Sequence, residues 1–256
     1  MQSKFTQKNQ SVDKVFHIIE FMSDTRMPLK LNEIATGVGF PASTALRLLT
    51  SLVEMGYVNQ DETTLKYSLT LKFCKIGDSV KSSLNITDIV RPYLVEISNK
   101  VGETTYFAIE RDMEVVYVDV IARTNVNDGT LKHIGRVAPL HATGLGKLML
   151  LNYDDSMLRK LEKEKGFPPL TENTITTFDA LQTELNEIRK KGYAIDEQEC
   201  EEGIRCVGVP IFDYTGRVLG GISVSGPTNR ITLDRIDEFL EVMLPVCKEI
   251  SKQFGA

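Results

Sequence analysis

The run Pro41-Ala42-Ser43-Thr44-Ala45-Leu46-Arg47-Leu48-Leu49 decides the fold of the first part of this chain, and it continues to Gly56. Proline suits the first turn of a helix, and glycine is typical of a helix end. Apolar residues at helical spacing predict one buried face. That face is expected to hold Ala42, Ala45, Leu46, Leu49, Leu52 and Val53. The opposite face presents Ser43, Thr44 and Arg47, which are two short hydroxyl side chains and one guanidinium.

Two further helices and a hairpin are expected around this helix. The first helix covers residues 12–22, and the second covers residues 32–36. The apolar face of the first helix is expected to hold Val12, Val15, Phe16, Ile19 and Met22. Residues 57–60 and 66–69 flank a polar turn, which predicts a two-stranded hairpin. Three helices followed by a hairpin make a winged helix-turn-helix, which we assign to residues 1–70.

The rest of the chain predicts a second, α+β domain. A connecting helix is expected at residues 71–84, and the helix that opens at Asn85 is expected to kink at Pro92. Strands are expected at residues 104–109, 115–121, 193–195, 206–212 and 218–224, with a loop before Pro139. Helices are expected at residues 145–151, 156–164, 178–191 and 233–254. Helices grouped between strands predict one mostly antiparallel sheet in a domain of residues 85–256.

Composition limits the classes of protein to consider. The chain has 256 residues, 42% hydrophobic and 25% charged, which is typical of a soluble globular protein. Residues 1–9 lack the apolar core of a signal peptide, and no charge-free apolar run could span a bilayer, so we expect a cytoplasmic protein. The four cysteines lack the paired spacing of a zinc site, and three histidines argue against catalytic zinc, so no metal or cofactor is expected.

The charge is distributed unevenly. Residues 1–80 hold 9 Lys and Arg against 8 Asp and Glu, whereas residues 81–256 hold 21 against 27. A slightly basic N-terminal part on an acidic body is compatible with a nucleic-acid contact confined to the N-terminus.

Three motifs in order make the chain resemble the IclR-type bacterial transcription regulators. The first is the Pro41–Leu49 run followed by residues 52–57, and the second is Leu140-His141-Ala142-Thr143-Gly144-Leu145-Gly146-Lys147. The third joins Lys191-Gly192-Tyr193-Ala194-Ile195-Asp196, Glu202-Gly203-Ile204-Arg205-Cys206 and Ile222-Ser223-Val224-Ser225-Gly226-Pro227. The resemblance covers the chain from Ser11 to Phe254. Lys30 departs from it, because such sequences often have Ser or Thr as the cap of the second helix, and we expect a looser cap there.

The resemblance implies that the third helix reads operator DNA. The major groove of DNA is wide enough for one α-helix. A helix that reads bases there needs short polar side chains near its start and an arginine or lysine that reaches guanine or phosphate. Ser43 and Thr44 are assigned to the DNA backbone or bases, Arg47 to guanine or phosphate, and Lys66 on the wing to phosphate. Because this helix carries so little positive charge, one copy is expected to bind DNA weakly. We therefore expect a homodimer, or a dimer of dimers, on a pseudo-palindromic operator. In similar proteins the N-terminal domain and the connecting helix supply the dimer contacts.

The resemblance also implies a GAF-like C-terminal domain that holds a small carboxylate effector, such as a keto, sugar or aromatic acid. A buried carboxylate needs N–H groups or hydroxyls directed at it. Gly144 and Leu145 open a helix whose N–H groups are unpaired, and Ser223 and Ser225 lie on one side of a strand. The remaining family positions of the pocket are Asp196, Ile204 and Cys206.

Two other functions remain open at this stage. Cys206 as nucleophile, His141 as base and Asp196 as the group orienting the base would suit an enzyme if the fold brought them together. His141 alone is more typical of a buried or capping histidine. A DNA-binding protein without a ligand would leave the large C-terminal domain unexplained. We therefore expect a regulator whose operator affinity is linked to effector binding. Most similar proteins are repressors, so we expect this protein to be a repressor.

Overall fold

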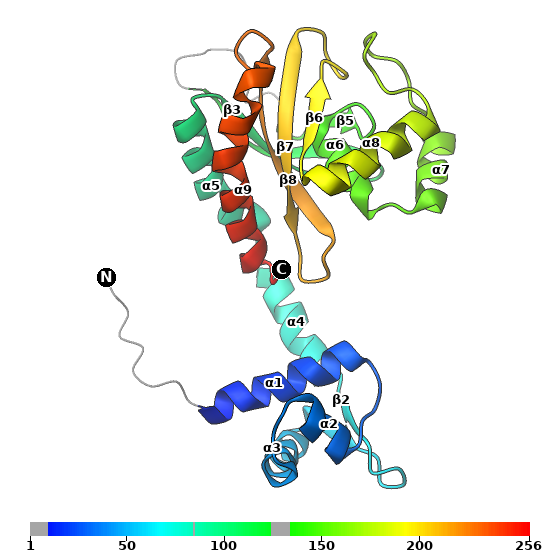
Figure 1. Ribbon diagram of the computed structural model, residues 1–256, viewed down its shortest axis with the longest axis vertical. Helices are drawn as coiled ribbons and strands as arrows, with labels where there is room; N and C mark the ends of the chain where they lie inside the picture. Colours follow the sequence, from blue (N-terminus) through cyan, green and yellow to red (C-terminus); the bar gives the residue numbers. More distant parts are fainter. Residues whose placement is uncertain (1–9, 84, 124–133) are drawn as a thin grey trace. The chain divides into compact units, whose positions relative to one another are not determined.

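The computed structural model describes residues 10–83, 85–123 and 134–256, and it divides the chain into two compact units, Met1–Leu84 and Asn85–Ala256. The N-terminal unit is a helix-turn-helix with a β-hairpin wing (Figure 1). Its elements are α1 (Gln10–Thr25), α2 (Leu31–Gly37), α3 (Ala42–Glu54), β1 (Val58–Gln60), β2 (Tyr67–Leu69) and α4 (Lys72–Ser83). Strands β1 and β2 pair antiparallel, as the hairpin pattern predicts.

The buried face of α3 is narrower than the sequence pattern predicts. Leu46 and Val53 are 44% and 36% exposed, whereas Leu48, which the pattern leaves out, is buried. The core of the unit is formed by Ile18, Met22, Ile34, Leu48, Leu49, Leu52, Val58 and Tyr67. Likewise Val12 and Phe16 of α1 are exposed, and Ile18 is buried in their place. A small three-helix core covers only a narrow stripe of each helix, so apolar residues at its margins stay in solvent.

Helix α2 begins without a cap from the side chain of Lys30, as expected. Instead, a Glu33 carboxylate oxygen accepts the backbone N–H of Lys30 at 2.6 Å. This is half of a capping box, and it partly replaces the missing hydroxyl.

The C-terminal unit is a six-stranded sheet with helices on both faces (Figure 1). The strand order is β5-β4-β3-β8-β7-β6, and every neighbouring pair is antiparallel. The strands are β3 (Thr104–Arg111), β4 (Glu114–Ile121), β5 (Val137–Pro139), β6 (Ala194–Glu197), β7 (Ile204–Phe212) and β8 (Val218–Pro227). Strand β5 corrects the expected loop before Pro139, because its three residues were too few to show an alternating pattern.

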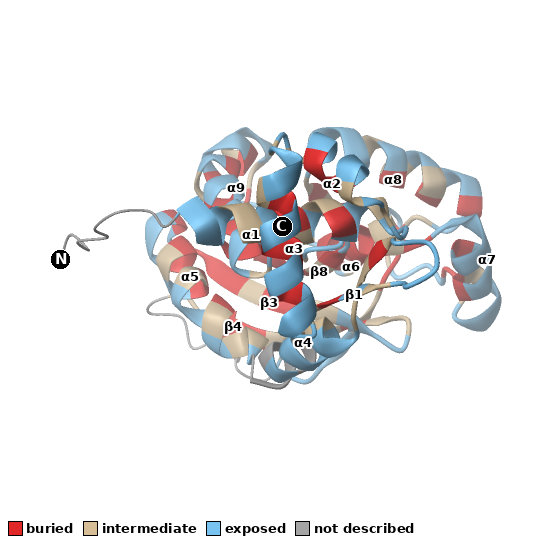
Figure 2. Cartoon of the chain, turned by 90° about the horizontal axis from the view of Figure 1, so that it is seen from below, coloured by how far each residue is buried: buried red, intermediate tan, exposed pale blue. Residues whose placement is uncertain are grey.

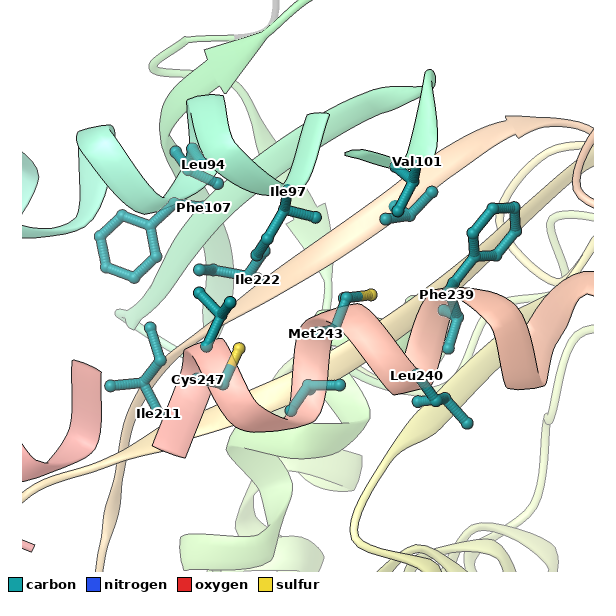
Figure 3. Packing of buried hydrophobic residues seen from close by; sticks show 14 of the residues in the cluster. Leu94, Ile97, Val101, Phe107, Ile211, Ile222, Phe239, Leu240, Met243 and Cys247 are labelled. Carbon is teal, nitrogen blue, oxygen red and sulfur yellow. The ribbon is translucent and has the colours of Figure 1, made fainter. Parts of the chain in front are cut away.

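One face of the sheet packs on α5 (Ile86–Val101) and α9 (Ile236–Gln253) (Figure 3). The side chains that face these helices come from alternate strand positions, such as Phe107, Ile211 and Ile222. The other face packs on α6 (Gly144–Met149), α7 (Asp155–Glu164) and α8 (Phe178–Lys191). Buried residues recur along one side of α8, while its other side is exposed (Figure 2). Short 3-10 helices at Leu150–Asn152 and Leu233–Arg235 precede α7 and α9.

Helix α6 lies directly on the sheet because β7 and β8 present glycine to it. A Cβ at Gly208 would lie 3.2 Å from Leu148 Cδ1, and one at Gly221 would lie 2.9 Å from Leu145 Cδ2. The helix itself needs glycine at position 146, where a Cβ would meet the carbonyl oxygen of Leu140 at 2.4 Å. All three positions therefore set how closely α6 approaches its surroundings.

Gly146→Ala should lower the free energy of unfolding of the C-terminal unit by about 1–3 kcal/mol, because the two nearest atoms in its way belong to the backbone of Leu140. Gly144→Ala, two residues earlier, is the matched control, since its nearest neighbour is Asp196 N at an ordinary 3.5 Å. Urea unfolding followed by circular dichroism measures both. Equal losses in the two variants would contradict the close contact at Gly146.

Candidate functional site

The exposed face of α3 carries the residues expected to read DNA. Ser43 and Arg47 are exposed and Thr44 is half-buried. The Thr50 and Ser51 hydroxyls donate to the carbonyls of residues 46 and 47 on the same helix, so they are turned toward their own backbone. Apart from the exposed Glu54 at the end of the helix, the polar side chains left to project from α3 therefore cluster in its first two turns.

The start of α3 is not capped by a side chain. Thr44 N and Ala45 N donate to the carbonyl of Pro41, the residue before the helix, whereas Ala42 and Ser43 offer N–H groups at the positive end of the helix dipole. Lys66, expected on the wing, is half-buried and immediately precedes β2. The α3 positions and the wing residue thus come from separate elements of one unit.

The C-terminal unit contains a cavity of about 670 Å³ over the face of the sheet that α6 leaves uncovered. Its floor is a row of cross-strand neighbours on four adjacent strands. Asp196 on β6 pairs with Cys206 on β7, Cys206 pairs with Ser225 on β8, and Ser225 pairs with Thr104 on β3. The Cys206 Sγ and Ser225 Oγ atoms are 2.8 Å apart. Register thus gathers residues that are far apart in the sequence onto one surface.

Five of the seven predicted pocket residues line this cavity, namely Asp196, Ile204, Cys206, Ser223 and Ser225. Gly144 and Leu145 do not. The Leu145 side chain is buried in the core against the glycines of the sheet. Thr143, just before them, lines the cavity instead, and its hydroxyl accepts the N–H of Gly146.

Several residues that line the cavity were not predicted from the sequence. They include Thr104, Tyr106, Tyr117, Arg136, Thr143 and Arg230. Thr104 and Tyr106 alternate along β3 as Ser223 and Ser225 do along β8, and this was the one signal available. Arg136 and Arg230 lie outside the strands, and only the fold brings them to the cavity.

Asp196 is a buried carboxyl group at the edge of the cavity. Its Oδ1 atom accepts the backbone N–H groups of Glu199 at 2.7 Å and Cys200 at 3.3 Å. Burial raises the pKa of Asp196 to about 7, although the N–H of Glu199 acts in the opposite direction. This carboxyl group therefore changes its charge near neutral pH.

A buried lysine holds the loop that follows Asp196. Lys147 on α6 is 1% exposed, and its Nζ lies 2.5 Å from Glu199 Oε1 and 3.1 Å from Glu184 Oε1. Burial raises the pKa of Glu199, and the ammonium acts to lower it. Glu199 also donates its backbone N–H to Asp196. The Lys147–Glu199 ion pair therefore stabilises the position of Asp196 in the wall of the cavity.

The possible catalytic set does not come together. The His141 Nε2 atom lies 3.1 Å from the carbonyl oxygen of Pro168, and its ring packs against Phe167. His141 lies outside the cavity that Cys206 and Asp196 line, and burial lowers its pKa. Burial likewise raises the pKa of Cys206 well above its usual value, so the sulfur is a thiol rather than a nucleophilic thiolate. His141 is the buried, hydrogen-bonded histidine that its surroundings in the sequence suggested.

Comparison with known proteins agrees with this architecture in both units. The model of the IclR helix-turn-helix domain matches residues 11–62, and the model of the bacterial transcriptional regulator IclR C-terminal domain matches residues 78–252. The chain belongs to the IclR family of bacterial transcriptional regulators. It is 32% identical over 245 residues to the HTH-type transcriptional regulator KdgR of Escherichia coli, covering 96% of this chain and 92% of that protein.

Other IclR-family proteins are similar over nearly the whole chain. The transcriptional repressor IclR of Escherichia coli is 31% identical over 248 residues, covering 96% of this chain and 90% of that protein. The crystal structure of Thermotoga maritima IclR, 32% identical, superposes with a TM-score of 0.63 over 96% of this chain and 99% of that chain. The family and these relatives are regulators, so the chain is a DNA-binding transcriptional regulator and not an enzyme.

Within the described residues, no helix is long and apolar enough to cross a membrane. The same part of this IclR-family chain contains no group of three His, Cys, Asp or Glu side chains that could hold a metal ion.

The raised pKa of Asp196 predicts how stability changes with pH. The folded unit binds this proton more tightly than the unfolded chain, so the contribution of Asp196 is complete below pH about 4 and is lost as the pH rises through 7. Asn at this position stays neutral and can still accept both N–H groups. Asp196→Asn should therefore gain about 2 kcal/mol of stability relative to the unmodified chain between pH 5 and pH 8.

Urea unfolding at the two pH values measures this difference. Asp154→Asn is the control, because the pKa of that exposed capping carboxyl is lowered by the N–H of Met157. Its stability relative to the unmodified chain should stay the same at the two pH values, because this carboxyl is already ionised in both the folded and the unfolded chain at pH 5 and above. A pH profile that Asp196→Asn leaves unaltered would contradict the buried, protonated state of Asp196.

Proposed function

We propose that this protein is a repressor that binds operator DNA as a homodimer, or as a dimer of dimers. Its affinity for the operator falls or rises when a small carboxylate occupies the C-terminal cavity. The observation that supports this most directly is the polar cavity of about 670 Å³ in a chain that also carries a helix-turn-helix. Pockets of this size suit small metabolites. The relative named transcriptional repressor IclR supports the direction of the effect.

The first two turns of α3 would enter the major groove. Ser43 and Thr44 would contact bases or the DNA backbone, and Arg47 would reach guanine or phosphate. The uncapped N–H groups at the start of the helix suit a phosphate, and Lys66 would add a phosphate contact from the wing. With so few cations, sequence-specific affinity would need two reading helices on a pseudo-palindromic site.

Exposed apolar side chains of the N-terminal unit support association between copies. Val12 and Phe16 lie four residues apart on α1 and are 49% and 56% exposed. Leu71, just before α4, and Ile76 on it are 83% and 48% exposed. Large apolar side chains exposed on helices are typical of protein interfaces, so α1 and the connecting helix would supply the dimer contacts.

The cavity would hold a carboxylate through arginine and hydroxyl groups. Arg136 is exposed at its margin, and among the described residues no carboxylate lies within ion-pair distance of it. Ser223 and Ser225 could donate hydroxyl protons to the same anion, with the N–H groups of Gly144 and Leu145 behind Thr143, whose own hydroxyl proton goes to the carbonyl of Pro139. Cys206 and Ile204 would form the remaining wall, and Asp196 its polar end.

Linkage would couple the two events. A metabolite that binds one arrangement of the domains more tightly changes operator affinity by the same factor by which DNA changes metabolite affinity. We assign residues 1–70 to DNA binding, residues 71–84 to transmission, and residues 85–256 to the effector. Such a regulator would act in the cytoplasm, where the chromosome lies.

Arg47→Ala should weaken operator binding by about 1–3 kcal/mol if the guanidinium reads guanine, or reduce the salt dependence by about one ion if it contacts phosphate. Fluorescence anisotropy with operator DNA at several salt concentrations distinguishes the two. Arg217→Ala removes an exposed arginine of the C-terminal unit and serves as the control. Equal affinity for Arg47→Ala and Arg217→Ala would exclude the assigned role of Arg47.

The proposed function is tested by gel-shift titration of the DNA upstream of its own gene, with and without small keto, sugar and aromatic acids. We expect specific binding that one class of acid strengthens or releases by at least about tenfold, which corresponds to typical allosteric coupling. Specific DNA binding that no acid alters would reject the effector role, and absence of specific binding would reject the operator role.

A further inference from the structure

We infer that Lys72 and Thr70 are positioning residues for the DNA-reading helix, because together they hold the C-terminal end of α3 against the start of α4. The chain passes from α4 directly into the C-terminal unit, which begins at Asn85. A rigid contact between the two helices makes α3 follow any movement of α4. This inference rests on the proposed function, because it takes α3 as the helix that reads the operator and α4 as the element that transmits.

The C-terminal end of α3 has carbonyl groups that need partners. The last carbonyls of an α-helix have no N–H partner within the helix, and they form the negative end of its dipole. In α3 the carbonyls of residues 51–53 accept N–H groups from residues 55–57, and the carbonyls of Met55 and Gly56 lie beyond these bonds. The last turn of α3 contains Glu54 and no basic residue. The helix therefore brings no cation of its own to its negative end.

Lys72, the first residue of α4, supplies this cation from another element. Its Nζ donates to the carbonyl of Met55, 17 positions earlier in the chain, at 2.6 Å. The same ammonium lies over the ring of Tyr57, 4.4 Å from the ring centroid. A cation is favoured both at the C-terminal end of a helix and over the face of an aromatic ring. The carbonyl and the ring thus hold one side chain of α4 at the end of α3.

The hydroxyl of Thr70 joins the two helix ends directly. Its Oγ1 donates to the carbonyl of Gly56 at 2.7 Å and accepts the backbone N–H of Lys72 at 3.3 Å. One hydroxyl is therefore the partner of a carbonyl that follows α3 and of the first N–H of α4. The backbone N–H of Thr70 also donates to the carbonyl of Tyr57 at 3.0 Å. The negative end of one helix dipole meets the positive end of another here, so electrostatics favours the same arrangement.

We call this set of contacts the α3–α4 joint, formed by Met55, Gly56, Tyr57, Thr70 and Lys72. The ring of Phe73, the second residue of α4, adds a contact with the ring of Tyr57 at a centroid distance of 5.0 Å. Neither Lys72 nor Thr70 belongs to the apolar core of the N-terminal unit. Replacing either side chain should therefore loosen the α3–α4 joint and leave the unit folded.

A direct contact between Lys72 and a DNA phosphate is the alternative role for this lysine. A lysine that neutralises a phosphate adds about one to the slope of log affinity against log salt concentration, because it releases a counterion. A positioning residue changes the affinity and leaves that slope unaltered. Thr70 is neutral, so it contributes to affinity through position and not through counterion release. The two residues together therefore distinguish the two roles.

Amide hydrogen exchange of the full-length protein without DNA tests the α3–α4 joint itself. Lys72→Met and Thr70→Val keep the size of each side chain and remove its hydrogen bonds. In both variants the amides of residues 54–58 and 70–74 should exchange at least about threefold faster, which corresponds to the loss of one such exposed interaction. Lys72→Arg should restore slow exchange, because a guanidinium also donates to a carbonyl and stacks on a ring. Thermal unfolding shows that each variant is folded.

Fluorescence anisotropy with the DNA upstream of its own gene, at several salt concentrations, tests the effect on DNA binding. Lys72→Met and Thr70→Val should each weaken binding by at least about threefold with an unaltered salt slope, and Lys72→Arg should bind as the unmodified chain does. Lys75→Met is the matched control, because it removes an exposed lysine of the same helix for which the described residues provide no hydrogen bond or ion pair. It should leave both exchange and affinity unchanged.

The outcomes separate this inference from the proposed function. Unchanged exchange in both variants overturns the α3–α4 joint, whatever the DNA measurements give. A salt slope that falls by about one in Lys72→Met, with full affinity in Thr70→Val, makes Lys72 a phosphate contact and the positioning role wrong. Faster exchange with full operator affinity in both variants, while Arg47→Ala weakens binding, also overturns the positioning role and leaves the proposed function intact. If Arg47→Ala binds fully as well, α3 is not the reading helix, and that part of the proposed function is rejected together with the inference.

Discussion

The close seating of α6 on the sheet is the constraint on which the C-terminal unit depends. Glycine at positions 208 and 221 removes the side chains that would hold the helix away from β7 and β8. Because α6 has only six residues, it covers only part of this face, and Cys206, Ser223 and Ser225 on the same strands remain open as the floor of the cavity. The core beneath α6 and the floor of the cavity are thus adjacent parts of one face of the sheet. Glycines lie under the helix, whereas residues with side chains form the floor of the cavity.

The buried lysine of α6 connects this packing to the electrostatics of the cavity. A fully buried ammonium is costly unless it is paired, and Lys147 is paired with Glu199 and Glu184. Glu199 in turn positions Asp196 through its backbone N–H. The same helix therefore supplies both the packing surface that bounds the cavity and the charge that holds its wall in place.

The two units divide the work of a regulator by chemistry. The N-terminal unit offers short polar side chains and free N–H groups at the start of α3, which suit a polyanion with readable base edges. The C-terminal unit offers a cavity lined by hydroxyls and by charges of both signs, which suit a small polar metabolite. Neither surface has the thiolate or the histidine pairing that catalysis by Cys206 and His141 would need.

The sequence by itself determined the order and type of nearly all elements, because helical and strand periodicity are local properties of the chain. It also predicted Ser223, Ser225, Cys206 and Asp196 as a group, since their motifs resemble those of the IclR family. Only the tertiary structure decided that Leu46 is exposed and Leu48 buried, because the width of a buried stripe depends on the neighbouring helices. It alone brought Arg136, Tyr106 and Thr143 to the cavity and excluded Leu145, because strand register and helix seating are set by contacts between distant segments.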